Sequence, residues 1–305
     1  MAPSAQPKVL TARLLRNWPL PQPGEGGDKE ERGRVLVVGG ASEMPGALIL
    51  AATAVLRAGA GKLQIATSQT VAPLIAAHVP EARVFALPET KSGAVVASAA
   101  DLIAEHANKV HALLVGPGMI EESIVTRLMK NVVPQLHYPV LIADAAAMSF
   151  LGEAPHALAH LHQQAIITPH GGEMAGLLGI EKKEIAGDAP AVARRAAREF
   201  KCVVALKGRE TIICDARNNA YVNRTGNVGL AISGSGDTLS GIIAGLAARG
   251  AAPIQAAAWG VYLHGSAGDK LARSMGPLGF LPRELLAEVP ALMATLGGLK
   301  KVGKR

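Results

Sequence analysis

One stretch organises the rest of the chain: Asn223-Arg-Thr-Gly-Asn-Val-Gly-Leu-Ala-Ile-Ser-Gly-Ser-Gly-Asp237-Thr-Leu-Ser-Gly-Ile-Ile-Ala-Gly-Leu246. It combines a glycine-rich loop with the start of an apolar helix. Gly234 and Gly236 allow a sharp turn that leaves backbone N–H groups uncovered. A helix that opens near Asp237 adds free N–H groups and the positive end of its dipole, which favour an anion. We therefore predict an anion hole formed by Gly234, Ser235 and Gly236.

A carboxylate stands beside this anion hole. Phosphate binding alone explains Asp237 poorly, because like charges repel. A role as the group that orients a substrate hydroxyl, or takes its proton, during phosphoryl transfer explains it better. The alternative is a structural one, in which Asp237 only caps the helix after a tight turn. We favour the catalytic interpretation because glycines are so dense upstream.

Composition predicts a layered α/β protein. Of 305 residues, 49% are hydrophobic and only 3% aromatic, which suits a core of Val, Ile, Leu and Ala. The formal net charge is +7, but Lys300, Lys301, Lys304 and Arg305 supply four positive charges at the C-terminus, leaving +3. This remainder is too small to argue for nucleic acid, and it suits small anionic ligands.

Cysteine usage indicates a reducing compartment, and hydropathy argues against a membrane-spanning protein. Cys202 and Cys214 lie in apolar runs without metal-ligand spacing, so we expect buried thiols. The N-terminus shows no signal sequence, and no run approaches the ~20 apolar residues that span a bilayer. We expect a cytoplasmic protein that has no membrane partner.

Buried strands and helical segments alternate along most of the chain, which predicts a mainly parallel sheet with helices on both faces. We expect an irregular arm over residues 1–32, one catalytic domain over 33–297 and a basic tail over 298–305. Expected strands are Arg34–Val38, Lys62–Thr67, Val84–Leu87, Ala112–Val115, Val140–Asp144, Ala165–Thr168 and Cys202–Leu206, then a hairpin of Thr211–Asp215 and Asn219–Asn223. Expected helices are Ala47–Ala58, Val71–His78, Gly93–Ala107, Glu121–Val133, Glu173–Leu178, Ala189–Phe200, one opening at Asp237, Pro253–Arg273 and Arg283–Leu296.

Ligands of open α/β sheets bind beyond the carboxyl ends of the strands. The loops there are rich in glycine, as in Gly39–Gly46 and Gly116-Pro-Gly118. A dinucleotide-binding oxidoreductase is disfavoured, because G-x-G-x-x-G is absent and the second strand ends in Ala66-Thr67-Ser68 without an acidic residue. A Walker A loop is absent too.

The motifs, taken together, resemble those of the ADP/ATP-dependent NAD(P)H-hydrate dehydratases, a branch of the ribokinase-like superfamily. The resemblance covers about residues 30–290. It is carried by Gly39-Gly-Ala-Ser-Glu-Met-Pro-Gly-Ala47, Arg57-Ala-Gly-Ala-Gly61, Gly116-Pro-Gly118, Asp144-Ala-Ala-Ala-Met148, Thr168-Pro-His-Gly-Gly-Glu173, Lys207-Gly-Arg-Glu-Thr211, Asn223-Arg-Thr-Gly-Asn227, Gly234-Ser-Gly-Asp237 and His264-Gly-Ser-Ala-Gly-Asp269.

The resemblance implies a ribokinase-like α/β/α sandwich and a lyase that repairs hydrated NADH or NADPH. ADP or ATP would phosphorylate the ring hydroxyl, and loss of phosphate would restore the cofactor. Asp237 would act on the hydroxyl beside the Gly234–Gly236 anion hole, with Gly236 close to the nucleotide. The resemblance further assigns nucleotide phosphates to Lys207, Gly208, Arg209, Glu210 and Thr211, the hydrated cofactor to Ala47, Gly118, His170 and Asp237, and Mg²⁺ to Glu173 through water.

Structural alternatives exist for several of these residues. His170 could merely cap a helix, Glu173 could only stabilise a helix dipole, and Lys207 could be a solvated turn residue. Asp144 fits a structural role. We assign no catalytic role to His264.

The sequence departs from the family pattern at four places. Gly171 and Arg224 each replace a usual proline, Ala146 replaces a frequent acidic residue, and one residue is inserted between Pro139 and Asp144. Two other functions stay open. One is a kinase for a small alcohol such as a vitamin precursor, and the other is a non-catalytic nucleotide-binding regulator, which Asp237 disfavours.

The resemblance also implies partners. Many relatives carry a fused epimerase domain on the N-terminal side, for which about 32 residues are too few, so we expect a separate epimerase. We also expect a homo-oligomer.

Overall fold

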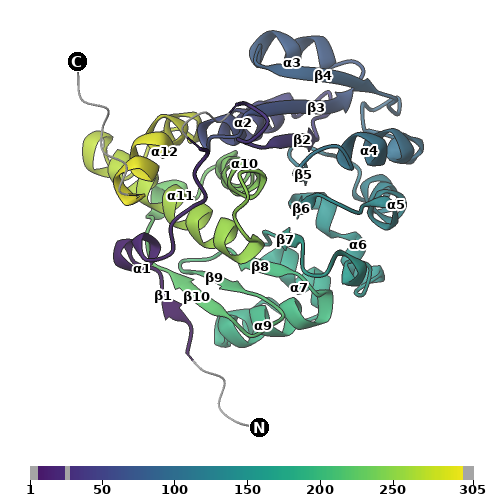
Figure 1. Ribbon diagram of the computed structural model, residues 1–305. Coiled ribbons are helices and arrows are strands. Elements are labelled where there is room, and N and C mark those ends of the chain that lie inside the picture. Colours follow the sequence, from purple (N-terminus) through teal and green to yellow (C-terminus); the bar gives the residue numbers. More distant parts are fainter. Residues whose placement is uncertain (1–5, 25–27, 298–305) are drawn as a thin grey trace, which may run out of the picture.

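The computed structural model describes residues 6–24 and 28–297. Its centre is a ten-stranded sheet in the order β1-β10-β9-β8-β7-β6-β5-β2-β3-β4 (Figure 1). Neighbouring strands are parallel except in the pairs β8–β9 and β9–β10. The strands are β1 (Lys8–Val9), β2 (Arg34–Val38), β3 (Lys62–Ser68), β4 (Ala82–Leu87), β5 (Ala112–Val115), β6 (Val140–Ala143), β7 (Ala165–Ile167), β8 (Val203–Leu206), β9 (Thr211–Cys214) and β10 (Ala220–Asn223).

Helices cover both faces of the sheet, which confirms the predicted three-layer α/β/α architecture. One layer holds α1 (Ala12–Arg16), α2 (Pro45–Arg57), α3 (Ala72–His78), α10 (Ser235–Ala248), α11 (Pro253–Met275) and α12 (Pro282–Leu296). The other holds α4 (Ala100–Ala107), α5 (Glu122–Val132), α6 (Phe150–Glu153), α7 (Gly171–Leu178), α8 (Lys182–Gly187) and α9 (Ala189–Phe200). Short 3₁₀ turns are η1 (Ala97–Ala99), η2 (Val133–Gln135), η3 (Ala145–Met148), η4 (Ala159–Leu161) and η5 (Val228–Leu230).

Each central strand supplies both hydrophobic cores. Side chains alternate across a strand, so Val35 and Val37 of β2 face one core while Leu36 and Val38 face the other. All four are fully buried, and strands buried on both faces read as unbroken apolar runs. The two cysteines are buried free thiols, as expected. Among the described residues, no helix has the length and apolar character to cross a membrane.

The N-terminal segment differs from the expected irregular arm. Residues Lys8–Val9 form β1, which pairs in parallel with β10 at the edge of the sheet. Helix α1 follows, and its N-cap Thr11 accepts a hydrogen bond from the Leu14 amide (3.1 Å). The irregular arm was predicted from its prolines and glycines, but residues 8–18 contain neither, and β1 and α1 form there. The basic tail over 298–305 lies outside the described residues.

The strand order creates a crevice. The chain runs β2-β3-β4 outward in one direction and returns to place β5 on the other side of β2. Such a switch in strand order opens a ligand crevice at the carboxyl ends of the strands. The loops after β2 and β5 meet there, because the Gly40 amide donates to the Pro117 carbonyl (2.8 Å). A Cβ on Gly39 would lie 2.2 Å from that carbonyl oxygen, so glycine is required.

Candidate functional site

The start of α10 is built as an anion site. Gly234 is the N-cap and has a left-handed backbone (φ +90°), where a Cβ would lie 2.6 Å from Leu50 Cδ1. The first helical hydrogen bond here runs from the Thr238 amide to the Gly234 carbonyl (3.1 Å), so the amides of Gly236 and Asp237 precede the helical ladder. Asp237 is the third helical residue and not the N-cap, which argues against the capping alternative.

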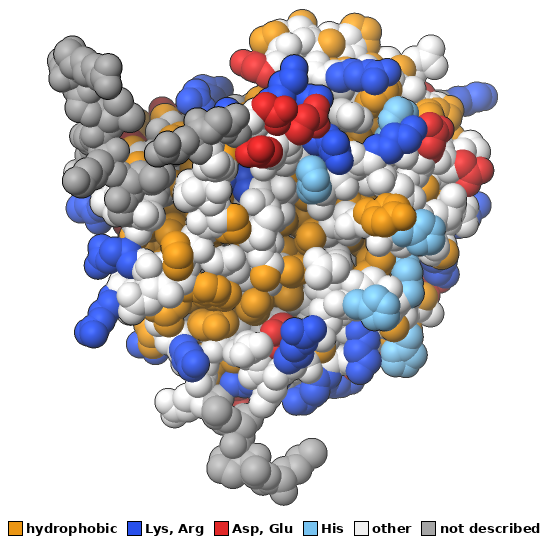
Figure 2. Space-filling view, viewed as in Figure 1, with side chains coloured by type: hydrophobic (Ala, Val, Ile, Leu, Met, Phe, Trp, Pro, Cys, Tyr) orange, Lys and Arg blue, Asp and Glu red, His pale blue; other side chains and the backbone are white. Residues whose placement is uncertain are grey.

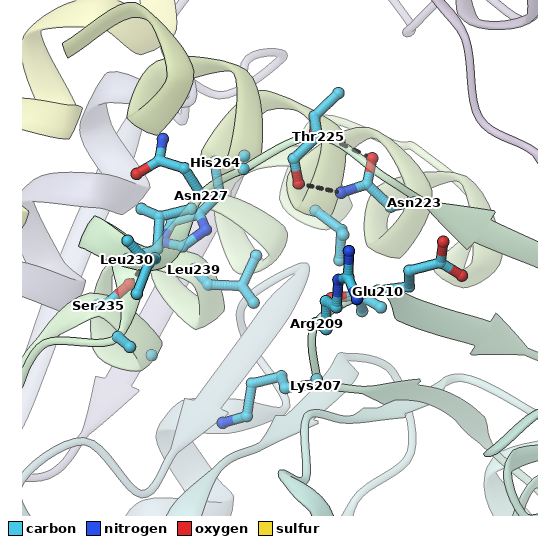
Figure 3. A pocket seen from close by; sticks show the side chains of 18 of the residues that line it. Lys207, Arg209, Glu210, Asn223, Thr225, Asn227, Leu230, Ser235, Leu239 and His264 are labelled. Carbon is cyan, nitrogen blue, oxygen red and sulfur yellow. Dashed lines mark hydrogen bonds between the residues drawn. The ribbon is translucent and has the colours of Figure 1, made fainter. Parts of the chain in front are cut away.

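A cavity of about 1060 Å³ lies in front of this helix end (Figure 3). Lys207, Arg209 and Glu210 approach it from one side, and Ser235, Leu239 and His264 from the other. Its wall comprises His170, Lys207, Gly208, Arg209, Glu210, Thr211, Asn223, Arg224, Thr225, Gly226, Asn227, Val228, Leu230, Ala231, Ile232, Ser235, Gly236, Leu239, Val261, His264 and Gly265. All five residues predicted to hold nucleotide phosphates line this cavity.

Lys207 directly follows β8 and places an ammonium group at the anion site. Its Nζ lies 3.5 Å from the position that a Cβ on Gly236 would occupy. The same Nζ is 3.4 Å from Asp144 Oδ1 and 3.9 Å from Glu173 Oε2. The lysine is therefore not a solvated turn residue, since neighbouring carboxylates direct its charge toward the helix end.

Asp144 is buried at the end of β6, the second strand from β8. Its Oδ1 accepts a hydrogen bond from Thr168 Oγ1 (2.7 Å) in addition to the contact with Lys207. The adjacent strands β6, β7 and β8 thus bring together side chains that are 63 positions apart in the sequence. The structural role suggested for Asp144 is supported by this network.

The carboxyl group of Asp237 has an altered acidity. Burial and then the negative charge of Asp144 raise the pKa of Asp237 to about 6, while Lys207 and the backbone partly oppose the rise. A general base works best when its pKa lies near the operating pH. At neutral pH, Asp237 is ionised and still basic enough to accept a proton.

His170 and Glu173 form a capping box at the start of α7. The Glu173 amide donates to His170 Nδ1 (3.0 Å), and the His170 amide donates to Glu173 Oε2 (2.7 Å). The structural alternatives for both residues are therefore present in the structure. Each side chain also reaches the site, because His170 lines the cavity and Glu173 lies near Lys207 Nζ. A Cβ on Gly171 would meet nothing within 4 Å, so the packing leaves room for the proline that is usual at this position.

Ala47 and Gly118 lie together at the crevice between β2 and β5, outside the wall of the large cavity. Gly118 has a left-handed backbone (φ +68°), and a Cβ there would lie 3.1 Å from the Ala47 Cβ and 2.4 Å from the Met44 carbonyl oxygen. Two of the four residues predicted for the hydrated cofactor are thus neighbours, whereas His170 lines the large cavity. Neither Ala47 nor Gly118 belongs to the wall of the large cavity.

Arg224, one of the departures from the family pattern, lines the cavity. Its Nε donates to Glu210 Oε1 (2.9 Å). The register of β9 and β10 explains the pair, because Asn223 is opposite Thr211 and the next residues outward are Arg224 and Glu210. The turn beyond is held without a proline, since Thr225 Oγ1 donates to Asn223 Oδ1 (3.0 Å) and Asn223 Nδ2 donates to the Thr225 carbonyl (3.0 Å; Figure 3).

His264 is the site residue to which sequence reasoning gave no role. Its Nε2 lies 3.0 Å from Ser235 Oγ, and both residues are buried at the cavity wall. Burial lowers the pKa of His264 to about 4. Its motif was noted in the sequence, but only the packing of α11 on α10 shows which side chain of that motif reaches the site. Asp269 binds the loop instead, accepting from the Gly226 amide (2.9 Å).

A metal ion at this site would need ligands from substrate phosphates and water in addition to protein side chains. Within residues 6–24 and 28–297, no group of three or more His, Cys, Asp or Glu side chains is placed to hold one. Mg²⁺ commonly uses one or two carboxylates with substrate phosphates and waters. Glu173 and Asp144 offer carboxylates of that kind beside the anion site, so the donor chemistry fits.

On the face shown in Figure 2, Lys and Arg are spread around the margin and do not form one patch.

Comparison with known proteins agrees with this geometry. The sequence profile of the NAD(P)H-hydrate dehydratase family matches residues 35–291. The chain is 43% identical to the ADP-dependent (S)-NAD(P)H-hydrate dehydratase of Xanthomonas campestris pv. campestris, over 95% of this chain and 97% of that protein. Some other relatives are bifunctional NAD(P)H-hydrate repair enzymes, and the chain spans about half of their length.

Two solved structures are similar across almost the whole chain. The ADP/ATP-dependent NAD(P)H-hydrate dehydratase of Bacillus subtilis, co-crystallised with ATP and Mg²⁺, has 28% identity and a TM-score of 0.79, covering 95% of this chain and 99% of that one. A ribokinase-like superfamily protein of Enterococcus faecalis has 26% identity and a TM-score of 0.82, covering 95% and 96%. The ribokinase-like fold is thereby confirmed, and the chain belongs to the NAD(P)H-hydrate dehydratase family.

Proposed function

We propose that this protein uses a nucleotide to dehydrate hydrated NADH or NADPH back to the reduced cofactor. One observation carries the proposal: the carboxyl group of Asp237, with its pKa near 6, lies directly beside the free amides that begin α10 and close to the Lys207 ammonium. This combination of a base with an anion site is what phosphoryl transfer to a hydroxyl requires. The relative in Xanthomonas is named for the corresponding dehydration.

The residues divide the reaction between them. Asp237 accepts the proton of the ring hydroxyl as the hydroxyl oxygen bonds to the terminal phosphorus of the nucleotide. The bond from that phosphorus to the bridging oxygen breaks, and AMP leaves from ADP, or ADP from ATP. Lys207 and the amides of Gly236 and Asp237 bind the negative charge of the phosphoryl group. The C–O bond then breaks, and phosphate leaves with the bonding electrons. The lone pair of the ring nitrogen forms a C=N double bond to the same carbon. Loss of a proton from the neighbouring ring carbon restores the dihydronicotinamide.

The two substrates occupy different places. The nucleotide lies in the large cavity, with its phosphates on the Lys207–Thr211 loop. The hydrated cofactor lies in the crevice at Ala47 and Gly118 and reaches Asp237 with its nicotinamide ring. His170, exposed at the cavity wall, contacts the cofactor where the two sites meet. A dinucleotide needs this additional crevice, whereas a small alcohol does not.

Mg²⁺ would neutralise charge on the nucleotide phosphates, and Glu173 would hold it through water. Glu173 Oε2 accepts a hydrogen bond from the His170 amide, and Glu173 Oε1 lies 3.7 Å from His170 Nε2. We further propose ADP as the preferred donor, because the Xanthomonas relative is named ADP-dependent.

The proposal extends to the oligomeric state, a partner enzyme and the cellular location. We propose a cytoplasmic homo-oligomer that works with an epimerase of the hydrated cofactor, since some relatives are named bifunctional repair enzymes. Size-exclusion chromatography with light scattering measures the oligomer directly. A monomer at micromolar concentration would refute that part.

The direct test is absorbance at 340 nm during incubation of hydrated NADH with Mg²⁺ and ADP or ATP. Recovery of NADH that depends on nucleotide is expected, and faster recovery with ADP would identify the donor. No recovery with either nucleotide, from folded protein that binds ADP by calorimetry, would refute dehydration and point to a kinase of a small alcohol.

A further inference from the structure

The cavity wall contains a buried pair that the proposed reaction has not used. We propose that His264 is a positioning residue. Its neutral imidazole, with the hydrogen on Nε2, donates to Ser235 Oγ, so that the serine hydroxyl donates its own hydrogen to the transferring phosphoryl group. This inference rests on the proposed function, because it names a further donor for the same phosphoryl transfer.

The backbone of Ser235 explains why the hydroxyl matters. The Ser235 amide donates to the Ile232 carbonyl (3.2 Å), so it is turned away from an incoming anion. Among the first residues of α10, Ser235 therefore offers the anion site its side chain. The hydroxyl lies 3.0 Å from His264 Nε2, and Ser235 and His264 both line the nucleotide cavity (Figure 3).

The direction of this hydrogen bond decides whether the hydroxyl attracts or repels a phosphate. A serine hydroxyl has one hydrogen and two lone pairs. If it donated to His264, only lone pairs would remain for the phosphate oxygens, and these repel an anion. If His264 donates, the hydroxyl hydrogen is free for the phosphate. An anion bound here thus selects the tautomer with the hydrogen on Nε2.

The acidity of the imidazole fits a neutral donor. Burial is the main cause that lowers the pKa of His264 to about 4; a hydrogen bond with the Ser235 backbone opposes the shift, and the Lys207 charge adds to it. The ring is therefore uncharged at neutral pH. It exchanges no proton with the substrate, and its function is to hold the hydroxyl in one orientation.

The rest of the His264–Asp269 motif holds α11 against the loop that leads to the site. A Cβ on Gly265 would lie 2.3 Å from Thr225 Oγ1, and one on Gly268 would lie 2.8 Å from the Leu230 side chain. Asp269 accepts hydrogen bonds from the loop residues Gly226 and Asn227. The glycines permit close packing and the aspartate fixes the register, which together place His264 beside Ser235.

The test is a double-mutant cycle with the nucleotide-dependent NADH recovery assay. His264→Leu removes the donor and Ser235→Ala removes the hydroxyl, and each is expected to lower kcat about 100–1000-fold, as loss of one transition-state donor does. Because His264 acts through Ser235, the double variant should be no slower than Ser235→Ala. His264→Gln, whose amide can also donate, should recover most of the activity. Ser233→Ala, an exposed serine of the same loop, is the matched control and should equal the wild type.

A second readout does not depend on activity or on the variants folding. The ¹⁵N shifts of the His264 ring, measured on wild-type protein saturated with ADP, report which nitrogen carries hydrogen. Hydrogen on Nδ1 with bare Nε2 would overturn the proposal, as would an unchanged kcat for Ser235→Ala or losses that multiply in the double variant. Absence of NADH recovery by the wild type would instead refute the proposed function, and the tautomer would still be read from the spectra.

Discussion

Replacing Asp237 by asparagine should abolish turnover and at the same time stabilise the folded protein at pH 8. Both effects come from one feature, the burial that raises the pKa of the Asp237 carboxyl group. Asparagine has nearly the same shape and keeps the site intact, but it accepts no proton and carries no charge. General base catalysis contributes about 10²–10⁴-fold to a rate, so a loss of at least that size is expected in kcat.

The stability gain follows from the pKa. A rise from the ordinary value of 3.8 to about 6 corresponds to about 3 kcal/mol, at ~1.4 kcal/mol per tenfold change in acidity. Between pH 4 and 6 the folded state retains a proton that the unfolded state releases, so stability falls as the pH rises through this window. Above pH 6 the whole cost is present. Asp237→Asn avoids it, which should raise Tm by roughly 4–6 °C at pH 8.

The assay compares variant and wild type at two pH values. Thermal unfolding at pH 8 should show the higher Tm for Asp237→Asn, and the difference should shrink toward zero as the pH falls below the ordinary pKa of 3.8, because the carboxyl group is then neutral in both states. NADH recovery is measured on the same preparations, and ADP binding by calorimetry shows that the cavity survives. Equal Tm values at pH 8, or turnover close to that of the wild type, would refute the assignment of Asp237 as a partly buried base.

Three further outcomes are expected. The kcat/KM of the wild type should rise with pH and level off above about 6, because Asp237 must be ionised to accept a proton; a flat profile between pH 5 and 8 would contradict this. Lys207→Met should weaken ADP binding at least tenfold in calorimetry, since the cavity loses the ammonium beside the helix end, and equal affinity would argue against phosphate contact. Gly118→Ala should cost about 1–3 kcal/mol of unfolding free energy, because φ is +68° and the new Cβ meets the Met44 carbonyl at 2.4 Å. Gly46→Ala, whose Cβ meets nothing within 4 Å, is the control and should be nearly neutral in the same denaturant titration.

Much of the architecture could be predicted from local patterns. Apolar runs such as Arg34–Val38 and Ala112–Val115 became strands with the expected bounds, because a strand buried on both faces leaves an unbroken hydrophobic signal. The short helices α6 and α8 were not predicted, since four and six residues are too few to show a helical period. β1 was missed for a related reason, because two residues at a sheet edge carry almost no pattern.

The sequence by itself determined the chemical parts of the site: glycines that expose amides, a carboxylate beside them, and a lysine directly after a buried strand. These are local properties that depend on residue type and near neighbours. Tertiary structure decided which parts meet. Asp144, Glu173 and Lys207 converge only because β6, β7 and β8 are adjacent and parallel. His264 reaches Ser235 only because α11 packs on α10. The acidity of Asp237 also depends on burial and on a charge 93 positions away in the chain, which no local pattern contains.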